Sequence, residues 1–215
     1  MKFWSDSFKD GATIPGEFAF AVMDPKTHVA LSGNRNPHFA WSELPAGTKS
    51  LALVVHDPDV PSRGDNVNQE GKTVPLELPR VDFYHWTLVD IPAGVTEIKA
   101  GQFSNGVTAR GKPGPAVLGD VMPGARQGIN DYTGWFAGDG DMRGDYFGYD
   151  GPCPPWNDAL VHRYIFTLYA LDVEQLPVAG NLEGSVVVTA LRDHVLEQAS
   201  ITGLYTLNPN AVPRS

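Results

Sequence analysis

Short apolar segments separated by turn residues are the dominant pattern along the chain. Residues 51–55 form a continuous apolar run, which is typical of a strand buried on both faces. Residues 82–91 and 161–171 are rich in β-branched and aromatic side chains, which favour strands. The pattern also predicts short strands at 15–21, 38–44 and 201–207. Many short strands with Gly and Pro turns indicate a mainly β protein built as a sandwich.

Alternate side chains of a strand share one face of a sheet. In residues 161–171 this places His162 and Tyr164 on one face and Arg163 on the other. In residues 82–91 strict alternation places His85 and Thr87 together, with Trp86 on the opposite face. Both predicted strands therefore contribute a histidine to a sheet face that is otherwise largely apolar.

The segment near the C-terminus predicts a helix. Val187, Leu191, Val195 and Ala199 recur at helical spacing, and residues 189–198 contain neither Gly nor Pro. We therefore expect a helix over 186–198, followed by the strand at 201–207.

Two stretches interrupt the pattern of strands. Residues 64–81 are polar and contain Pro75 and Pro79, which predicts a long loop or insertion. Thirteen of the 23 glycines lie between Gly101 and Gly151, a density that cannot sustain regular structure for long. Aromatic residues throughout 102–147 nevertheless predict an ordered excursion that packs on the core. Because no shift in composition marks a boundary, we expect one domain over 1–215.

Composition and charge narrow the class of protein. A net charge of −9 and a pI near 5.0 argue against nucleic-acid binding, which leaves a basic footprint. The single cysteine excludes an intramolecular disulfide and suits a reducing compartment. The N-terminus lacks a secretory signal, and no apolar run approaches the roughly 20 residues that span a bilayer. We expect a cytoplasmic protein that is not integral to a membrane.

Two polar motifs flank the apolar segments. The run Asp57-Pro58-Asp59-Val60-Pro61-Ser62-Arg63 follows residues 51–55, and a Gly- and Pro-rich loop at 148–155 precedes the strand at 161–171. Glycine permits tight turns and proline fixes φ, so a rigid loop leads into a strand whose first inward residues are His162 and Tyr164. This arrangement predicts the mouth of a small polar pocket.

The residues of that pocket suit a small anion. His85 and His162 can donate N–H groups, and Tyr164 can donate its phenolic hydrogen. Asp57 has the wrong charge for an anion, so we expect it to accept a hydrogen bond from a histidine. Without a nearby Lys or Arg, binding should be of modest affinity and favoured at lower pH. Arg63 supplies a positive charge if its loop folds inward.

Arg163 and Cys153 have structural interpretations. Arg163 lies on the opposite face of its strand from His162, so we expect it to pair with Asp59. Cys153 has no base beside it in the sequence, so we expect a packed thiol and not a nucleophile.

Three stretches in this order resemble the phosphatidylethanolamine-binding protein family. They are the Asp-Pro-Asp-x-Pro run with Arg63, the triplet Tyr84-His85-Trp86, and Gly148-Tyr-Asp-Gly-Pro-Cys-Pro-Pro155 with His162-Arg163-Tyr164. The arrangement is similar to the bacterial, Raf-kinase-inhibitor-like branch. The resemblance implies an antiparallel Greek-key β-sandwich with long irregular loops, a C-terminal helix and a small anion pocket. The pocket residues that it implies are Asp57, Pro58, His85, Tyr149, Gly151, Pro154, Pro155, His162 and Tyr164, with Asp59, Pro61, Arg63 and Arg163 as the structural part of the motifs.

The resemblance favours a binding protein without catalytic residues, metal or cofactor. Its expected ligand is a small anionic or phosphorylated molecule, and its partners would be kinases or proteases whose activity it modulates. Residues 64–81 and 102–147 depart from compact bacterial members and read as insertions. The bacterial branch also leaves a homodimer open.

An enzyme is the alternative function. A hydrolase would use His85 or His162 as general base with Asp57 as the orienting group. A metal site would combine the same three side chains as two histidines and one carboxylate. No nucleophile motif is evident in the sequence, so we lean towards a protein that is not an enzyme.

Overall fold

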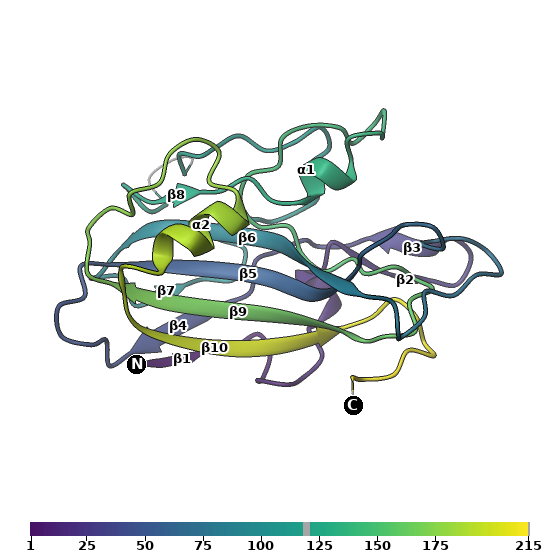
Figure 1. Ribbon diagram of the computed structural model, residues 1–215, viewed down its shortest axis with the longest axis horizontal. Helices are drawn as coiled ribbons and strands as arrows, with labels where there is room; N and C mark the ends of the chain where they lie inside the picture. The colour runs from purple at the N-terminus through teal and green to yellow at the C-terminus, as the bar shows by residue number, and fades with distance from the viewer. Residues whose placement is uncertain (118–120, 215) are drawn as a thin grey trace.

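Two antiparallel sheets pack face to face in the computed structural model, which describes residues 1–117 and 121–214 (Figure 1). The larger sheet has the order β10-β9-β5-β6-β8, and the smaller has the order β1-β4-β7. This confirms the predicted Greek-key β-sandwich. The strands of the larger sheet are β5 (Ser50–Pro61), β6 (Arg80–Pro92), β8 (Arg126–Gln127), β9 (His162–Leu171) and β10 (Val195–Tyr205). The smaller sheet contains β1 (Lys2–Trp4), β4 (Phe39–Ser42) and β7 (Glu97–Ile98).

The central strand β5 is buried on both faces, which explains its continuous apolar run. Leu51, Leu53 and Val55 enter the core between the two sheets. Ala52 and Val54 enter a second core on the other side, beneath the short helix α2 (Gly184–Leu191). Every residue of this run is therefore apolar, because neither face of the strand meets water.

The C-terminal helix is shorter than the sequence predicts. α2 ends at Leu191, and β10 begins at Val195, inside the stretch expected to continue the helix. β10 pairs with β9 from Val195 to Tyr205, and this long ladder overrides the local helical preference. The predicted helix at 186–198 is thus wrong beyond Leu191.

Strict alternation also fails in β6. Tyr84 pairs with His56 and Trp86 pairs with Val55, so His85 is an extra residue in a β-bulge. Downstream of the bulge the faces exchange, and Trp86 lies in the inter-sheet core on the same side as His85. Thr87 instead faces the second core, where its hydroxyl donates to the carbonyl of Leu182.

The N-terminal segment differs from the expected strand at 15–21. Gly16–Phe18 form a 3₁₀ turn, and β2 (Ala21–Asp24) begins only at the last residue of the expected strand. β2 pairs with β3 (His28–Leu31). The Asp-Pro-Asp-x-Pro run belongs to a strand. β5 continues through it to Pro61, with a register shift between Asp57 and Val60.

Both predicted excursions are ordered where they are described. The excursion at 102–147 contains β8 and the short helix α1 (Tyr132–Trp135), and its residues 118–120 lie outside the described part. Asn157 is one of the residues that hold the segment 64–81, because its Nδ2 donates to the carbonyls of Asn66 and Lys72. Within residues 1–117 and 121–214, no helix has the length and apolar character needed to cross a membrane.

Asn157→Ala should release the loop at 64–81 from the rest of the fold. The nearly buried amide also accepts from the N–H of Asn68, so its removal leaves several backbone groups without partners. We expect a loss of about 1–3 kcal/mol in the free energy of unfolding and faster tryptic cleavage after Lys72. Asn66→Ala, which removes one exposed hydrogen bond of 3.4 Å, is the matched control. Equal cleavage in both variants would contradict this role for Asn157.

Candidate functional site

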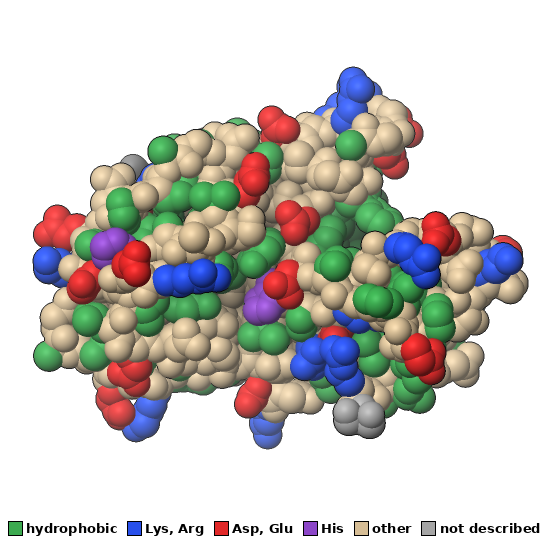
Figure 2. Space-filling model, viewed as in Figure 1, with side chains coloured by type: hydrophobic (Ala, Val, Ile, Leu, Met, Phe, Trp, Pro, Cys, Tyr) green, Lys and Arg blue, Asp and Glu red, His purple; other side chains and the backbone are tan. Residues whose placement is uncertain are grey.

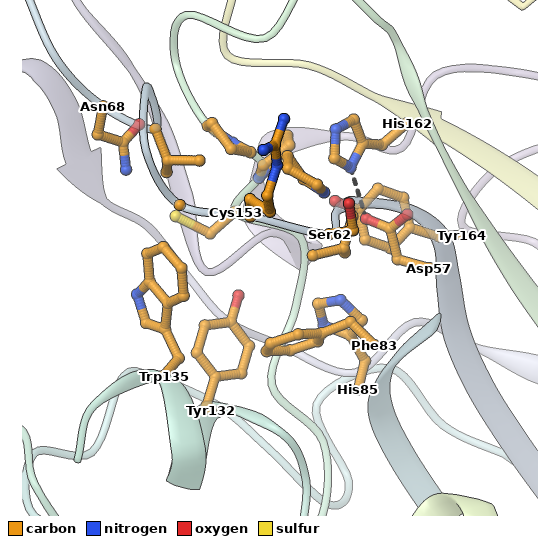
Figure 3. A pocket seen from close by; sticks show the side chains of 17 residues that line it. Asp57, Ser62, Asn68, Phe83, His85, Tyr132, Trp135, Cys153, His162 and Tyr164 are labelled. Carbon is orange, nitrogen blue, oxygen red and sulfur yellow. Dashed lines mark hydrogen bonds and ion pairs between the residues drawn. The ribbon is translucent and has the colours of Figure 1, made fainter. Parts of the chain in front are cut away.

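A cavity of about 150 Å³ opens where β5 ends and β6 and β9 begin (Figure 3). Because these neighbouring strands are antiparallel, the end of β5 and the starts of the other two meet at one edge of the sheet. The residues that line the cavity are Asp57, Val60, Pro61, Ser62, Arg63, Gly64, Val67, Asn68, Phe83, His85, Tyr132, Trp135, Cys153, Pro154, Pro155, His162 and Tyr164.

Most of the residues that the sequence places in the pocket do line the cavity, together with Pro61 and Arg63 from the structural part of the motifs. Pro58, Tyr149 and Gly151 are not among the lining residues. Tyr149 is buried behind the site, where its hydroxyl donates to the carbonyl of Phe18 at 2.6 Å. Gly151 shapes the loop, because a Cβ at this position would lie 2.2 Å from the Phe18 carbonyl oxygen.

His162 is clamped between two carboxylates and has no exposed surface. Its Nδ1 lies 2.7 Å from Oδ2 of Asp57, and its Nε2 lies 3.0 Å from Oδ2 of Asp158. Burial opposes the imidazolium, but the two carboxylates outweigh it and raise the pKa of His162 to about 9. His162 is therefore a charged cross-link whose two N–H groups are already used, and it has no donor left for an anion.

The charge network extends beyond this histidine. Asp158 also receives a bidentate interaction from Arg80, at 2.5 Å and 3.0 Å. Arg80 and His162 hold the pKa of Asp158 below its usual value, although its burial acts in the opposite direction. Asp57 additionally accepts from the backbone N–H of Asp59 at 2.8 Å. The polar end of the cavity is thus built from balanced, fully engaged charges.

A third buried carboxylate, Asp59, forms ion pairs on the far side of the same motif. Arg163 donates to it from Nε at 2.8 Å, which is the ion pair that the strand faces suggest. Arg214 from the C-terminal segment also donates to it, at 2.7 Å. These contacts point away from the cavity and hold the ends of β5 and β9 together.

His85 differs from His162 in both charge and bonding. Its Nδ1 lies 2.8 Å from the carbonyl oxygen of Asp150, which makes Nδ1 the protonated nitrogen of the neutral ring. Burial lowers the pKa of His85, so the ring is neutral near pH 7. Nε2 has no hydrogen-bond partner among the described residues, in which no fully buried side-chain nitrogen or oxygen lacks one. Nε2 is therefore open to the cavity as an acceptor.

Aromatic rings from the 102–147 excursion form the wall below His85. Figure 3 shows the rings of Trp135, Tyr132, Phe83 and His85 in a row along one side, facing Asp57, His162 and Tyr164. Tyr132 packs edge-on against His85, and its hydroxyl donates to the carbonyl of Gly151 at 2.7 Å. Trp135 is 54% exposed and stands at the mouth. The cavity therefore combines a polar end with an apolar side.

Two further side chains bear on the chemistry of the cavity. Burial raises the pKa of the Cys153 thiol to about 12, so it carries no thiolate near neutral pH. Arg63 lies at the rim with a side chain that is 69% exposed, and its nearest carboxylate, Asp65, is 3.8 Å away. Arg63 is thus a solvent-exposed positive charge at the mouth of the cavity.

The residues missed from the sequence are Asp158, Arg80, Phe83, Tyr132 and Trp135. Asp158 lies four residues before His162, in a polar pair that precedes a buried strand, and this spacing is a weak signal. The aromatic residues gave no signal for the site, because core packing accounts for their type equally well. In the described part of the chain, no group of three or more His, Cys, Asp or Glu side chains is arranged to hold a metal ion.

The charge on His162 should make stability depend on pH above neutrality. Its pKa rises from 6.5 to about 9 on folding, so the contribution is complete below pH 6.5 and disappears as pH rises through about 9. Denaturant unfolding should show a decline on the order of 3 kcal/mol across this window. The decline should be absent in His162→Gln and retained in His194→Gln, whose imidazole bonds Asp172 elsewhere. An unchanged slope in His162→Gln would show that another group titrates.

Comparison with known proteins identifies the family to which the chain is similar. The family described as phosphatidylethanolamine-binding protein matches residues 4–206. YbhB of Escherichia coli is 30% identical over 96% of this chain and 100% of its own length. An Aquifex aeolicus protein is 30% identical over 95% of this chain and 88% of its own length.

Two solved structures share the fold. The crystal structure of Escherichia coli YbcL superimposes with a TM-score of 0.66 and 29% identity. YbcL is described as a new member of the mammalian PEBP family, that is, the family of phosphatidylethanolamine-binding proteins. The match covers 95% of this chain and 97% of YbcL. A Chlamydia trachomatis homologue covers 94% of this chain and 95% of its own, with a TM-score of 0.57 and 24% identity, and bears on the fold alone. With its cavity, its motifs and these matches, the chain belongs to the phosphatidylethanolamine-binding protein family.

Proposed function

We propose that this protein binds a small molecule with an acidic group, such as phosphate or a phosphate monoester, without transforming it chemically. The observation that carries this proposal is the free Nε2 of His85 at the polar end of the cavity. The volume of about 150 Å³ is several times what one water requires, which suits a head group and not a whole lipid.

The proton on His85 is central to this proposal. An anion beside Nε2 favours the imidazolium, so binding a fully ionised ligand raises the pKa of His85 and takes up a proton. Burial lowers that pKa in the free protein. Affinity for such a ligand therefore increases as pH falls, by up to about tenfold per unit, until His85 of the free protein is itself protonated.

The rest of the ligand has two sets of contacts available. Arg63 can place its guanidinium on the acidic group from the rim, because its long side chain is mostly exposed. Trp135 and Phe83 offer apolar faces to a short organic substituent. The mixture suits a phosphorylated metabolite or head group better than a bare apolar compound.

In the hydrolase alternative, only one of the two histidines remains a candidate for the general base. His162 is protonated near pH 7 and has both nitrogens engaged, so it does not serve as a general base. His85 keeps a free nitrogen and could accept a proton from water. The metal alternative loses the same ligand, because His162 has no lone pair available while it is doubly protonated.

Several expectations from the sequence stay predictions. These are kinase or protease partners, a homodimer, a cytoplasmic location, a single domain over 1–215, and insertions at 64–81 and 102–147. The net charge of −9 disfavours stable docking on an anionic membrane, although the face in Figure 2 carries basic as well as acidic side chains.

Histidine-resolved NMR with inorganic phosphate and phosphoethanolamine between pH 5 and 8 tests the proposal. The His85 imidazole should shift saturably, and its pKa should rise in the complex, while His162 stays charged and responds little. His85→Gln should weaken binding by about tenfold or more, because a charge-assisted hydrogen bond is lost. His194→Gln is the matched control.

Two outcomes would count against this function. Absence of saturable binding at every pH from 5 to 8 would refute it. Release of phosphate from phosphoethanolamine by the wild type, lost in His85→Gln, would replace it with the hydrolase.

A further inference from the structure

Three side chains that line the cavity, those of His162, Tyr132 and His85, direct their hydrogen-bond donors to groups of the protein itself. His162 donates to Asp57 and Asp158, and the hydroxyl of Tyr132 donates to the Gly151 carbonyl. His85 donates its Nδ1–H to the Asp150 carbonyl and keeps only an acceptor for the cavity. The hydroxyl of Tyr164, which also lines the cavity, interacts with Asp57. A ligand therefore meets an acceptor at His85, and the cationic side chain among the lining residues that remains available is Arg63 at the rim.

The bonding of His85 is fixed by a buried carboxylate behind it. Asp150 has no exposed surface, and its side chain accepts from Asn34, Asn130 and Lys112, each at 2.8 Å. Its backbone N–H donates to the carbonyl of His85 at 3.1 Å, while its own carbonyl receives Nδ1–H. The peptide unit that chooses the tautomer of His85 is thus held by three segments that are distant in the sequence.

Lys112 balances the charge of this carboxylate. Its side chain is only 14% exposed, and its ammonium group also donates to the carbonyl of Tyr149. The charged groups facing His85 therefore come in compensated pairs: Asp57 with His162 from β5 and β9, and Asp150 with Lys112 behind the ring. The neighbouring Tyr132 and Tyr164 are neutral, because burial raises the pKa of both phenols well above the usual value.

We propose that the Lys112–Asp150 pair is a positioning device that keeps His85 neutral with Nε2 as an acceptor, so that the cavity selects acidic ligands that still carry a proton. This inference rests on the proposed function and specifies its ligand class. A phosphate monoester has a second pKa near 6, so near pH 7 about a tenth of it still carries a P–O–H that can donate to Nε2, and the cavity binds that protonated form. Sulfate has a similar shape and no proton to offer.

Phosphate and sulfate binding by the wild type tests the ligand class. At pH 7 phosphate should bind about tenfold or more tightly than sulfate, because sulfate leaves Nε2 facing an oxygen lone pair. As pH falls towards 5 the preference should shrink to the extent that His85 becomes protonated, since the imidazolium can donate to either anion. Equal binding at pH 7 would overturn this inference and leave the proposed function standing. Failure of phosphate to bind at both pH values would refute the proposed function itself.

Nitrogen-15 NMR of the free wild type tests the positioning without any ligand. His85 should be neutral at pH 7 with its proton on Nδ1. A proton on Nε2, or a charged ring at pH 7, would overturn the inference however tightly phosphate binds.

Variants of the pair give a signed test that a purely structural role would not reproduce. Lys112→Met leaves the Asp150 charge uncompensated, so His85 should protonate at higher pH and sulfate should gain affinity at pH 7. Asp150→Asn should move the titration of His85 to lower pH and preserve the preference for phosphate. Lys112→Arg should behave as wild type, and Lys99→Met, on an exposed lysine, is the control for charge. Shifts of the same sign in Lys112→Met and Asp150→Asn would contradict the charge pairing.

Discussion

The site depends on a chain of buried charges that runs from Asp57 through His162 and Asp158 to Arg80. Removing one member of such a chain leaves an unpaired charge in the interior, at a cost of about 3–5 kcal/mol. Its members come from β5, β9, the loop before β9 and the start of β6. The same contacts that satisfy these charges therefore hold together the three strand ends around the cavity.

The two histidines of the motifs have opposite physical roles, although they look equivalent in the sequence. Both nitrogens of His162 bond to carboxylates, so this residue is a cation at neutral pH and has a structural role. His85 is surrounded by aromatic rings and a backbone carbonyl, so it stays neutral and keeps one nitrogen open to the cavity. Burial acts on both rings in the same direction, and the number of carboxylates in direct contact decides the difference.

Sequence patterns predict the parts of this fold in which each residue has one dominant constraint. The apolar run of β5 and the alternation in β9 report burial directly, and the mainly β architecture follows from them. The motifs, taken in their order along the chain, also predict that Asp57, His85, His162 and Tyr164 lie in one pocket, and all four line the cavity. The bulge at His85 could not be predicted, because it arises from pairing with β5 and not from the residues of β6 themselves. The end of α2 at Leu191 likewise depends on the ladder between β9 and β10.

The ring of residues around the cavity is assembled from distant parts of the chain, with 105 positions separating Asp57 from His162. During synthesis the first half of the chain carries a carboxylate motif with no partner, and the cavity cannot exist until β9 has paired with β5. Such non-local pairing is slow, because the entropy of closing a long loop is lost before any contact compensates for it. A ligand that occupies the cavity can therefore bind only the fully folded protein. By mass action, such a ligand would shift the equilibrium between unfolded and folded molecules towards the folded state.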